Sequence, residues 1–223
     1  MILLALELTS EFGSLAIRRD GQTLLEQSIE SRVGFAHLVF PAIEKILSDA
    51  GMTLSRIDCF AASTGPGAFT GLRVALAAVK GLADVNGKPG VGVSKLRAMA
   101  SFGTGTRRIV LLDARRGDVF AAVYDEHLEP IVEETVTKPE LWLANLSESS
   151  GYQLITSDAA WLRGIVNSTR FAGVPWIETP RNLAGAIAEC AETDLRRGAR
   201  GDPSVLDANY VRRSDAELYW IDN

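Results

Sequence analysis

The hydrophobic pattern of this chain predicts short strands followed by helices, in an order that occurs twice. Residues 3–7 are an apolar run that ends on the carboxylate of Glu7. Residues 14–18 and 22–29 carry the short, partly alternating pattern of two further strands, and Arg19-Asp20-Gly21 between them is a turn signal. We therefore expect a three-stranded meander at the start of the chain.

The middle of the chain repeats this order. Residues 109–113 are again an apolar run that ends on a carboxylate, Asp113. The segments 119–124 and 128–136 follow as a second and a third strand, and about 106 residues separate corresponding positions of the two meanders. Helical segments follow both of them. The repetition predicts an internal duplication, although two such segments also resemble each other by chance.

Two helices are expected in the first half. In residues 35–50 the apolar side chains follow the three- and four-residue spacing of an amphipathic helix, and Pro41 either kinks this helix or marks its true start. Its apolar stripe comprises Phe35, Leu38, Val39, Ala42, Ile43, Ile46 and Leu47. The second helix, residues 72–85, is apolar on nearly every side. Such a helix must bury apolar side chains on two opposite sides. Either its own domain buries both sides, or its domain buries one side and a partner buries the other.

Polar positions on the second helix indicate which side faces outward. Arg73 and Lys80 cannot face a sheet, so their stripe is the outward one, and Ala77 lies near its middle. The neighbouring stripe of Leu72, Leu76 and Val79 is then the inward one.

A glycine-rich loop connects a predicted strand, residues 57–62, to this helix. Its shape-determining residues are Gly65, Pro66, Gly67, Thr70 and Gly71. Pro66 restricts its own φ and keeps Gly65 out of the α region, and the Thr70 hydroxyl is a candidate N-cap. The loop is therefore either an anion cradle, a rigid platform for a partner, or simply a tight turn.

Composition and charge narrow the class of protein. The 223 residues are 47% hydrophobic and 23% charged, as in soluble globular proteins, with no apolar run long enough to span a membrane. The net charge of −5 and a pI near 5.2 disfavour independent binding of nucleic acid. The first residues are expected to form a strand and not a signal peptide, and the two cysteines are expected to be buried free thiols. We expect a cytoplasmic protein.

Catalytic and metal-binding patterns are nearly absent from the sequence. The two histidines, His37 and His127, lack metal-ligand spacing, and there is no Cys-x-x-Cys. Glu7 and Asp113 are the best carboxylate pair, and in a two-lobed fold they would hold a magnesium ion or cap the turns that follow their strands. They are the weak candidates for cofactor binding. We expect no catalytic residue, no metal site and no cofactor.

The short Gly/Thr-rich segment 101–106 indicates a domain boundary. The predicted domains are residues 1–103 and 107–223. A last helix is expected to start at Thr179-Pro180 and to end near Arg197, with Gly198 after it. This helix and the tail can pack back on the first domain.

Four segments resemble the TsaB (YeaZ) family along essentially the whole chain. They are residues 65–73 (GPGAFTGLR), 91–96 (VGVSKL), 113–122 (DARRGDVFAA) and 209–212 (NYVR). The resemblance implies an α/β fold of the actin-like (ASKHA, ribonuclease H-like) type, duplicated, with two lobes that each contain a mixed sheet and flanking helices. It also implies a non-catalytic scaffold subunit of the complex that forms threonylcarbamoyladenosine in tRNA.

The resemblance implies partners as well. The catalytic subunit TsaD, which carries the metal-binding His motif absent here, would contact the two helices through Phe35, Leu38, Val39, Ala42, Arg73, Ala77 and Lys80. TsaE, an ATPase, would be the third member, tRNA would bind only through the complex, and a homodimer would form without TsaD.

Two departures bear on nucleotide binding. The family usually has Asp-Thr-Ser where this chain has Glu7-Leu8-Thr9-Ser10, and neither predicted phosphate loop has Asp-x-Gly. An ATP-dependent small-molecule kinase or acyl-phosphate enzyme remains the alternative. A metallopeptidase is disfavoured because the histidine pair is missing.

Overall fold

The computed structural model describes residues 1–146 and 151–211, so Arg212 of the NYVR segment lies outside the described residues. The described chain divides into two compact units. The first contains Met1–Ala98 and Arg181–Asn209, and the second contains Met99–Pro180 with Tyr210 and Val211. The chain thus returns to the first unit after Pro180.

The sheet of the first unit has the order β3-β2-β1-β4-β5. Its strands are β1 (Ile2–Glu7), β2 (Phe12–Arg19), β3 (Gln22–Glu30), β4 (Cys59–Ser63) and β5 (Gly90–Val93). β1, β2 and β3 form an antiparallel meander, whereas β4 runs parallel to β1 and β5 runs parallel to β4. β1 lies at the centre of the sheet, and all of its residues are buried.

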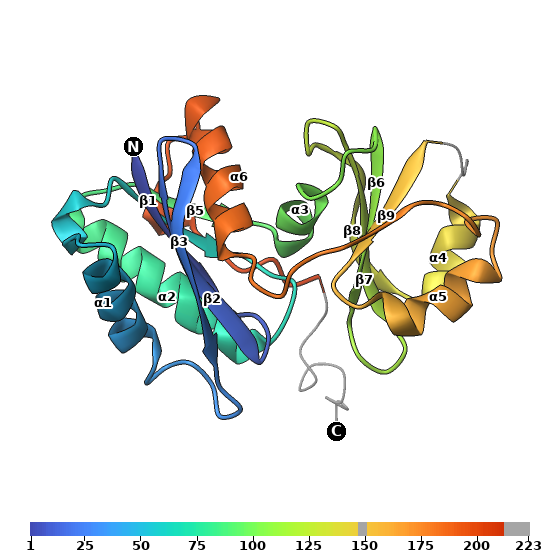
Figure 1. The fold of residues 1–223 in the computed structure, drawn as a ribbon, viewed down its shortest axis with the longest axis horizontal. Coiled ribbons are helices and arrows are strands. Elements are labelled where there is room, and N and C mark those ends of the chain that lie inside the picture. The colour runs from blue at the N-terminus through green and yellow to red at the C-terminus, as the bar shows by residue number, and fades with distance from the viewer. Residues whose placement is uncertain (147–150, 212–223) are drawn as a thin grey trace, which may run out of the picture. The chain divides into compact units, whose positions relative to one another are not determined.

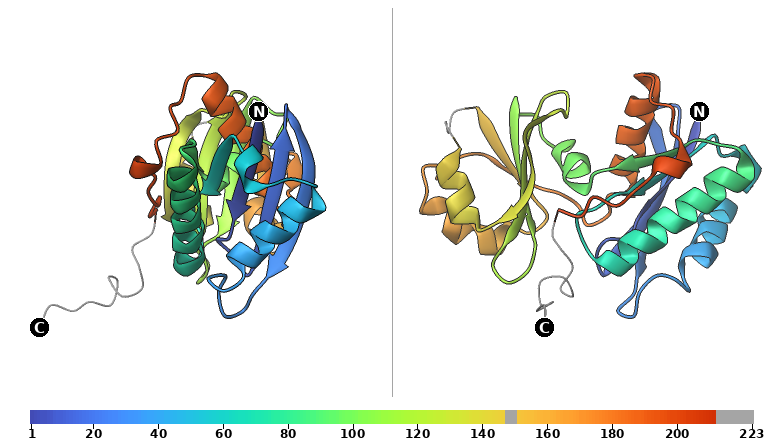
Figure 2. Two further views of the ribbon diagram at one scale, coloured as in Figure 1. Left: turned by 90° about the vertical axis from the view of Figure 1, so that its left-hand side faces the viewer. Right: turned by 180° about the vertical axis from the view of Figure 1, so that it is seen from behind.

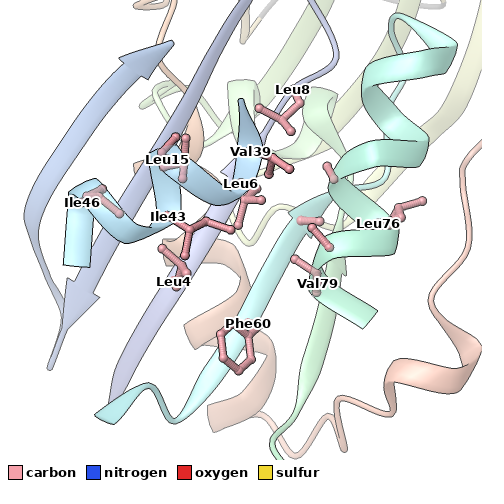
Figure 3. Close-up of a cluster of buried hydrophobic side chains, with 14 of the residues drawn as sticks. Leu4, Leu6, Leu8, Leu15, Val39, Ile43, Ile46, Phe60, Leu76 and Val79 are labelled. Carbon is pink, nitrogen blue, oxygen red and sulfur yellow. The ribbon is translucent and has the colours of Figure 1, made fainter. Parts of the chain in front are cut away.

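Helices cover both faces of this sheet (Figure 1). One face carries α1 (Val39–Asp49) and α2 (Phe69–Asn86), whose apolar stripes pack on alternate residues of β1, β2 and β4 (Figure 3). The other face carries α6 (Ala184–Arg196). Three shorter helices follow α1, β5 and α6 along the chain, namely η1 (Leu54–Arg56), α3 (Lys95–Ala100) and η2 (Pro203–Val205). No helix in residues 1–146 or 151–211 is long and apolar enough to cross a bilayer.

The sheet of the second unit has the order β8-β7-β6-β9-β10. Its strands are β6 (Arg107–Asp113), β7 (Val119–Asp125), β8 (Pro130–Thr137), β9 (Tyr152–Thr156) and β10 (Trp176–Glu178). The helices α4 (Pro139–Asn145) and α5 (Ala159–Asn167) bury Leu143, Leu162 and Val166 in its core.

The two sheets share one topology. If the strands of each unit are counted in chain order, both sheets have the order 3-2-1-4-5. In both, strands 1, 2 and 3 form an antiparallel meander, strand 4 runs parallel to strand 1, and strand 5 runs parallel to strand 4. Glu7 ends β1 and Asp113 ends β6, so the two carboxylates occupy corresponding positions. The predicted duplication of an α/β unit is confirmed.

The start of α6 differs from the sequence prediction. The helix begins at Ala184 and not at Pro180, because its first N–H groups are capped from other strands. The Ser14 hydroxyl accepts from the N–H groups of Leu183 and Ala184 at 3.1 and 3.0 Å, and Glu26 Oε1 accepts from that of Gly185 at 2.9 Å. Thr179, where the helix was expected to start, instead donates its N–H to the carbonyl of Thr156 at 2.8 Å.

Both cysteines are buried free thiols, as predicted. Burial raises the pKa of Cys59 and of Cys190 to about 12, and each thiol is therefore neutral at physiological pH. Neither is a candidate nucleophile.

Candidate functional site

The glycine loop, residues 64–68, connects β4 to α2 and is fixed by main-chain contacts. The Gly65 carbonyl accepts from the N–H of Lys95 at 2.6 Å, and the Ala68 N–H donates to the carbonyl of Thr9 at 2.7 Å. The peptide between Gly65 and Pro66 is cis. Because the Ala68–Thr9 contact sets where the chain turns, α2 has Ala68 as its N-cap without a side-chain bond. The prediction of Thr70 as N-cap is wrong, since Thr70 is the second residue of the helix.

Two glycines allow this loop and the start of α2 to lie against the segment after β1. A Cβ at Gly67 would overlap the carbonyl oxygen and the side chain of Thr9, and a Cβ at Gly71 would overlap the carbonyl of Leu8. The loop is therefore pressed onto residues 8 and 9 at distances that only glycine permits. This contact couples the end of β1 to the start of α2.

Beneath the loop lies a buried ion cluster made of Glu7, Thr9 and Lys95. Glu7 Oε1 accepts from the N–H of Thr9 at 2.8 Å and from its hydroxyl. Lys95 Nζ lies 3.1 Å from Thr9 Oγ1 and 3.6 Å from Glu7 Oε1. All three residues are buried. Lys95 was not among the predicted site residues, although it lies in the segment 91–96 and is a charge between the apolar residues Val93 and Leu96.

This arrangement does not fit a magnesium or nucleotide site at Glu7. The Lys95 ammonium already supplies the positive charge that a metal ion would bring, and Glu7 itself is inaccessible to solvent. Asp113 is engaged differently, because its Oδ1 accepts from the N–H of Arg115 at 2.7 Å and so caps the turn after β6. In residues 1–146 and 151–211 there is no group of three or more His, Cys, Asp or Glu side chains that could hold a metal.

The predicted partner residues of α1 need correction. Phe35, Val39 and Ala42 are at most 8% exposed and belong to the core of the first unit, where Figure 3 shows Val39 pointing between the sheet and α2. Leu38 is half-buried against the same core. These side chains are inward because the apolar stripe of an amphipathic helix packs on its own sheet first. A partner could reach exposed positions of α1 such as Phe40, which is 52% exposed.

The predicted partner residues of α2 lie on its accessible side. Leu72, Leu76 and Val79 are buried, as predicted for the inward stripe, whereas Arg73 and Ala77 are exposed and Lys80 is half-buried. We define the outer face of α2 as the exposed residues spaced four apart, namely Phe69, Arg73, Ala77, Gly81 and Val85. Apart from Arg73, whose guanidinium lies 3.8 Å from the centre of the Phe69 ring, this face is apolar or small.

Comparison with known proteins gives the family. Residues 32–171, more than half of the chain, match the family model described as TsaD: tRNA N6-adenosine threonylcarbamoyltransferase. The chain is 31% identical over 169 residues to the tRNA threonylcarbamoyladenosine biosynthesis protein TsaB of Escherichia coli K12, with 72% of each chain covered. The chain belongs to the TsaB (YeaZ) family. The TsaB of Bacillus subtilis 168 is 24% identical over 233 residues, covering 100% of this chain and 99% of that protein.

A solved structure of a TsaB-family protein agrees with the fold. YeaZ from Pseudomonas aeruginosa superimposes with a TM-score of 0.77 at 25% identity, covering 94% of this chain and 99% of that one. The fold is thus the duplicated, actin-like α/β fold that the resemblance implied.

Proposed function

We propose that this TsaB-family chain is a non-catalytic subunit in the biosynthesis of threonylcarbamoyladenosine in tRNA, and that it pairs with TsaD and activates it. TsaE is the proposed third member, and tRNA binds through the assembled complex in the cytoplasm. The relatives' names support a place in this modification. The observation that carries the scaffold role is the outer face of α2, where small and apolar side chains are exposed beside Arg73 on the side of the helix opposite its buried stripe.

The chemistry of the described residues favours a scaffold over an enzyme. His37 and His127 are both exposed and belong to different units. Glu7 is neutralised by Lys95, and Asp113 caps a turn, so neither of the two strand-end carboxylates is available in the way a kinase or acyl-phosphate enzyme requires. That alternative therefore receives no support from the geometry of these residues.

The outer face of α2 is suited to helix packing. Ala77 and Gly81 have small or absent side chains, which allow a partner helix to approach closely, and Val85 is 85% exposed at the far end. Phe40 of α1, which contacts α2, adds an exposed aromatic ring to the same side of the sheet. Without TsaD, a second copy of this chain would use the same face and give a two-fold homodimer.

The test is Ala77→Glu. A charge at the middle of the outer face would be desolvated in either complex at a cost of several kcal/mol, which weakens the Kd by more than about a hundredfold. The variant should keep its circular dichroism spectrum but lose co-elution with TsaD and the homodimer on size-exclusion chromatography. Ala160→Glu, the same change at an exposed position of α5, is the matched control and should elute as wild type does. Unchanged assemblies of Ala77→Glu would remove α2 from the interface.

A further inference from the structure

The turn between β6 and β7 has an unusual backbone. Three consecutive residues, Arg115, Arg116 and Gly117, have φ values of 67°, 58° and 74°. Gly117 adopts this conformation without strain, but for arginine the left-handed region is unfavourable, and asparagine or glycine is the usual residue of such turns. Two arginines thus occupy positions where asparagine or glycine would have a lower conformational free energy. Strain of this kind persists where the side chains have a use.

Contacts to the main chain hold the turn in this shape. Asp113 Oδ1 accepts from the N–H of Arg115 at 2.7 Å, and the Ala114 N–H donates to the Asp118 carbonyl at 3.0 Å. Lys138, the N-cap residue of α4, donates to the Arg116 carbonyl at 2.9 Å and pairs with Asp118 at 2.7 Å. The turn is therefore anchored to a second element, and its backbone is fixed while its arginine residues remain exposed.

The turn and its anchor contain three positively and two negatively charged side chains. The Asp118 charge is offset by Lys138, and the Asp113 carboxylate lies 3.7 Å from Arg115 Nη1. This last pair is solvent-exposed, with 81% of the Arg115 side chain accessible, so it contributes little and a stronger anion can replace it. Counting Asp113, Asp118, Arg115, Arg116 and Lys138, the turn and its anchor carry a net charge of +1 on a chain whose total is −5.

Arginines of two other pairs in the described chain also make contacts within it. Arg108 is buried and donates to the carbonyls of Gly105 and Ala100. Arg107 lies over the ring of Tyr152 at 5.6 Å, and Arg196 pairs with Glu192 at 2.7 Å. The Arg115–Arg116 pair is distinguished by its backbone, because both residues lie at positive φ in an anchored turn, and not by an absence of contacts.

We propose that Arg115 and Arg116 bind phosphate groups of the tRNA in the assembled complex. This inference rests on the proposed function, in which tRNA is the substrate. Guanidinium groups suit phosphate oxygens because their N–H donors form paired, charge-assisted hydrogen bonds. Two such contacts position an RNA without reading its sequence, and they are too few for the isolated acidic chain to bind RNA by itself.

The test replaces both arginines by asparagine, a residue that tolerates positive φ, in Arg115→Asn/Arg116→Asn. The variant should fold and assemble with TsaD as wild type does. Its complex should bind tRNA with a salt dependence, log K against log salt concentration, that is less steep by about 1.5, since each phosphate contact contributes about 0.7 to 0.9. Between 50 and 200 mM salt, the wild-type complex should then lose about eightfold more affinity than the variant.

Two further variants separate charge from shape. Arg115→Lys/Arg116→Lys keeps both charges and should retain the wild-type salt dependence. Arg56→Gln/Arg200→Gln removes two exposed charges elsewhere and should leave tRNA binding unchanged. If the complex with Arg115→Asn/Arg116→Asn binds tRNA with wild-type affinity and wild-type salt dependence, the proposed phosphate contact is wrong, but the proposed function is unaffected. Loss of TsaD binding by that variant also overturns it and makes the turn a protein contact. If the wild-type chain forms no tRNA-binding complex with TsaD, the proposed function itself fails.

Discussion

At the scale of single residues, the site depends on Thr9. Its carbonyl accepts from Ala68 of the glycine loop, its hydroxyl contacts both Glu7 and Lys95, and Gly67 lies directly against it. The sequence made the glycines and Glu7 candidate residues, whereas Thr9 and Lys95 were noted only as parts of longer segments. Those two residues are far apart in the chain, and only the parallel pairing of β1, β4 and β5 brings them together.

Gly67→Ala tests this packing. The new methyl group would overlap the Thr9 main chain, which cannot move without disturbing β1, so the free energy of unfolding should fall by about 1–3 kcal/mol. Urea unfolding followed by circular dichroism measures the change. Gly81→Ala is the control, because a Cβ at this position in the middle of α2 would have no heavy atom within 4 Å apart from the adjoining helix backbone. It should raise the stability by about 0.5–1 kcal/mol, as alanine does in a helix. Equal stability of the Gly67→Ala protein and wild type would refute the close contact.

At the scale of elements, the sequence predicted those helices and strands whose formation depends on residues close to one another in the chain. The antiparallel meanders, α1, α2 and the end of α6 before Gly198 follow from apolar periodicity and turn residues. The start of α6 could not be predicted, because Ser14 and Glu26 of other strands supply its caps. For the same reason the inward direction of Phe35 and Val39 became clear only once the sheet was known.

A strap, residues 201–209, is another element that local patterns did not reveal. It runs beside β5 and α2, drawn in red in Figure 2, and the Gly90 N–H donates to the Gly201 carbonyl at 2.7 Å. Its end is fixed near the glycine loop, where the Asn209 N–H donates to the Thr64 carbonyl at 2.8 Å. Leu206, 6% exposed, joins the core that contains Ala83. The strap thus covers the edge strand β5.

Leu206→Ala tests whether the strap is part of the folded unit. Removal of this buried side chain should lower the free energy of unfolding by about 2–5 kcal/mol, measured by urea unfolding. Val205→Ala alters the neighbouring residue, which is 74% exposed, and should change stability by less than about 0.5 kcal/mol. If both variants unfold at the same urea concentration as wild type, the strap does not contribute to the stability of the first unit.

At the scale of the whole molecule, the duplicated fold does not by itself imply the ATPase activity associated with actin-like proteins. A fold supplies positions, and the side chains at those positions decide the activity. Here the two corresponding strand ends have diverged. Glu7 forms an internal ion pair, and Asp113 supports the Arg115–Gly117 turn. In both halves of the duplication the strand-end carboxylate thus makes a contact within the chain.

The isolated chain should therefore bind Mg-ATP weakly. Phosphate binding at the end of β1 would have to displace Lys95 from Glu7 and Thr9, which leaves a buried carboxylate without its counter-charge, and that loss is strongly unfavourable. Titration of Mg-ATP by calorimetry should show no binding tighter than about 1 mM, or roughly −4 kcal/mol. TsaE, the ATPase of the proposed complex, serves as the positive control in the same buffer. Micromolar binding by the isolated chain would favour the kinase alternative, because it would mean that the ion cluster opens to admit nucleotide.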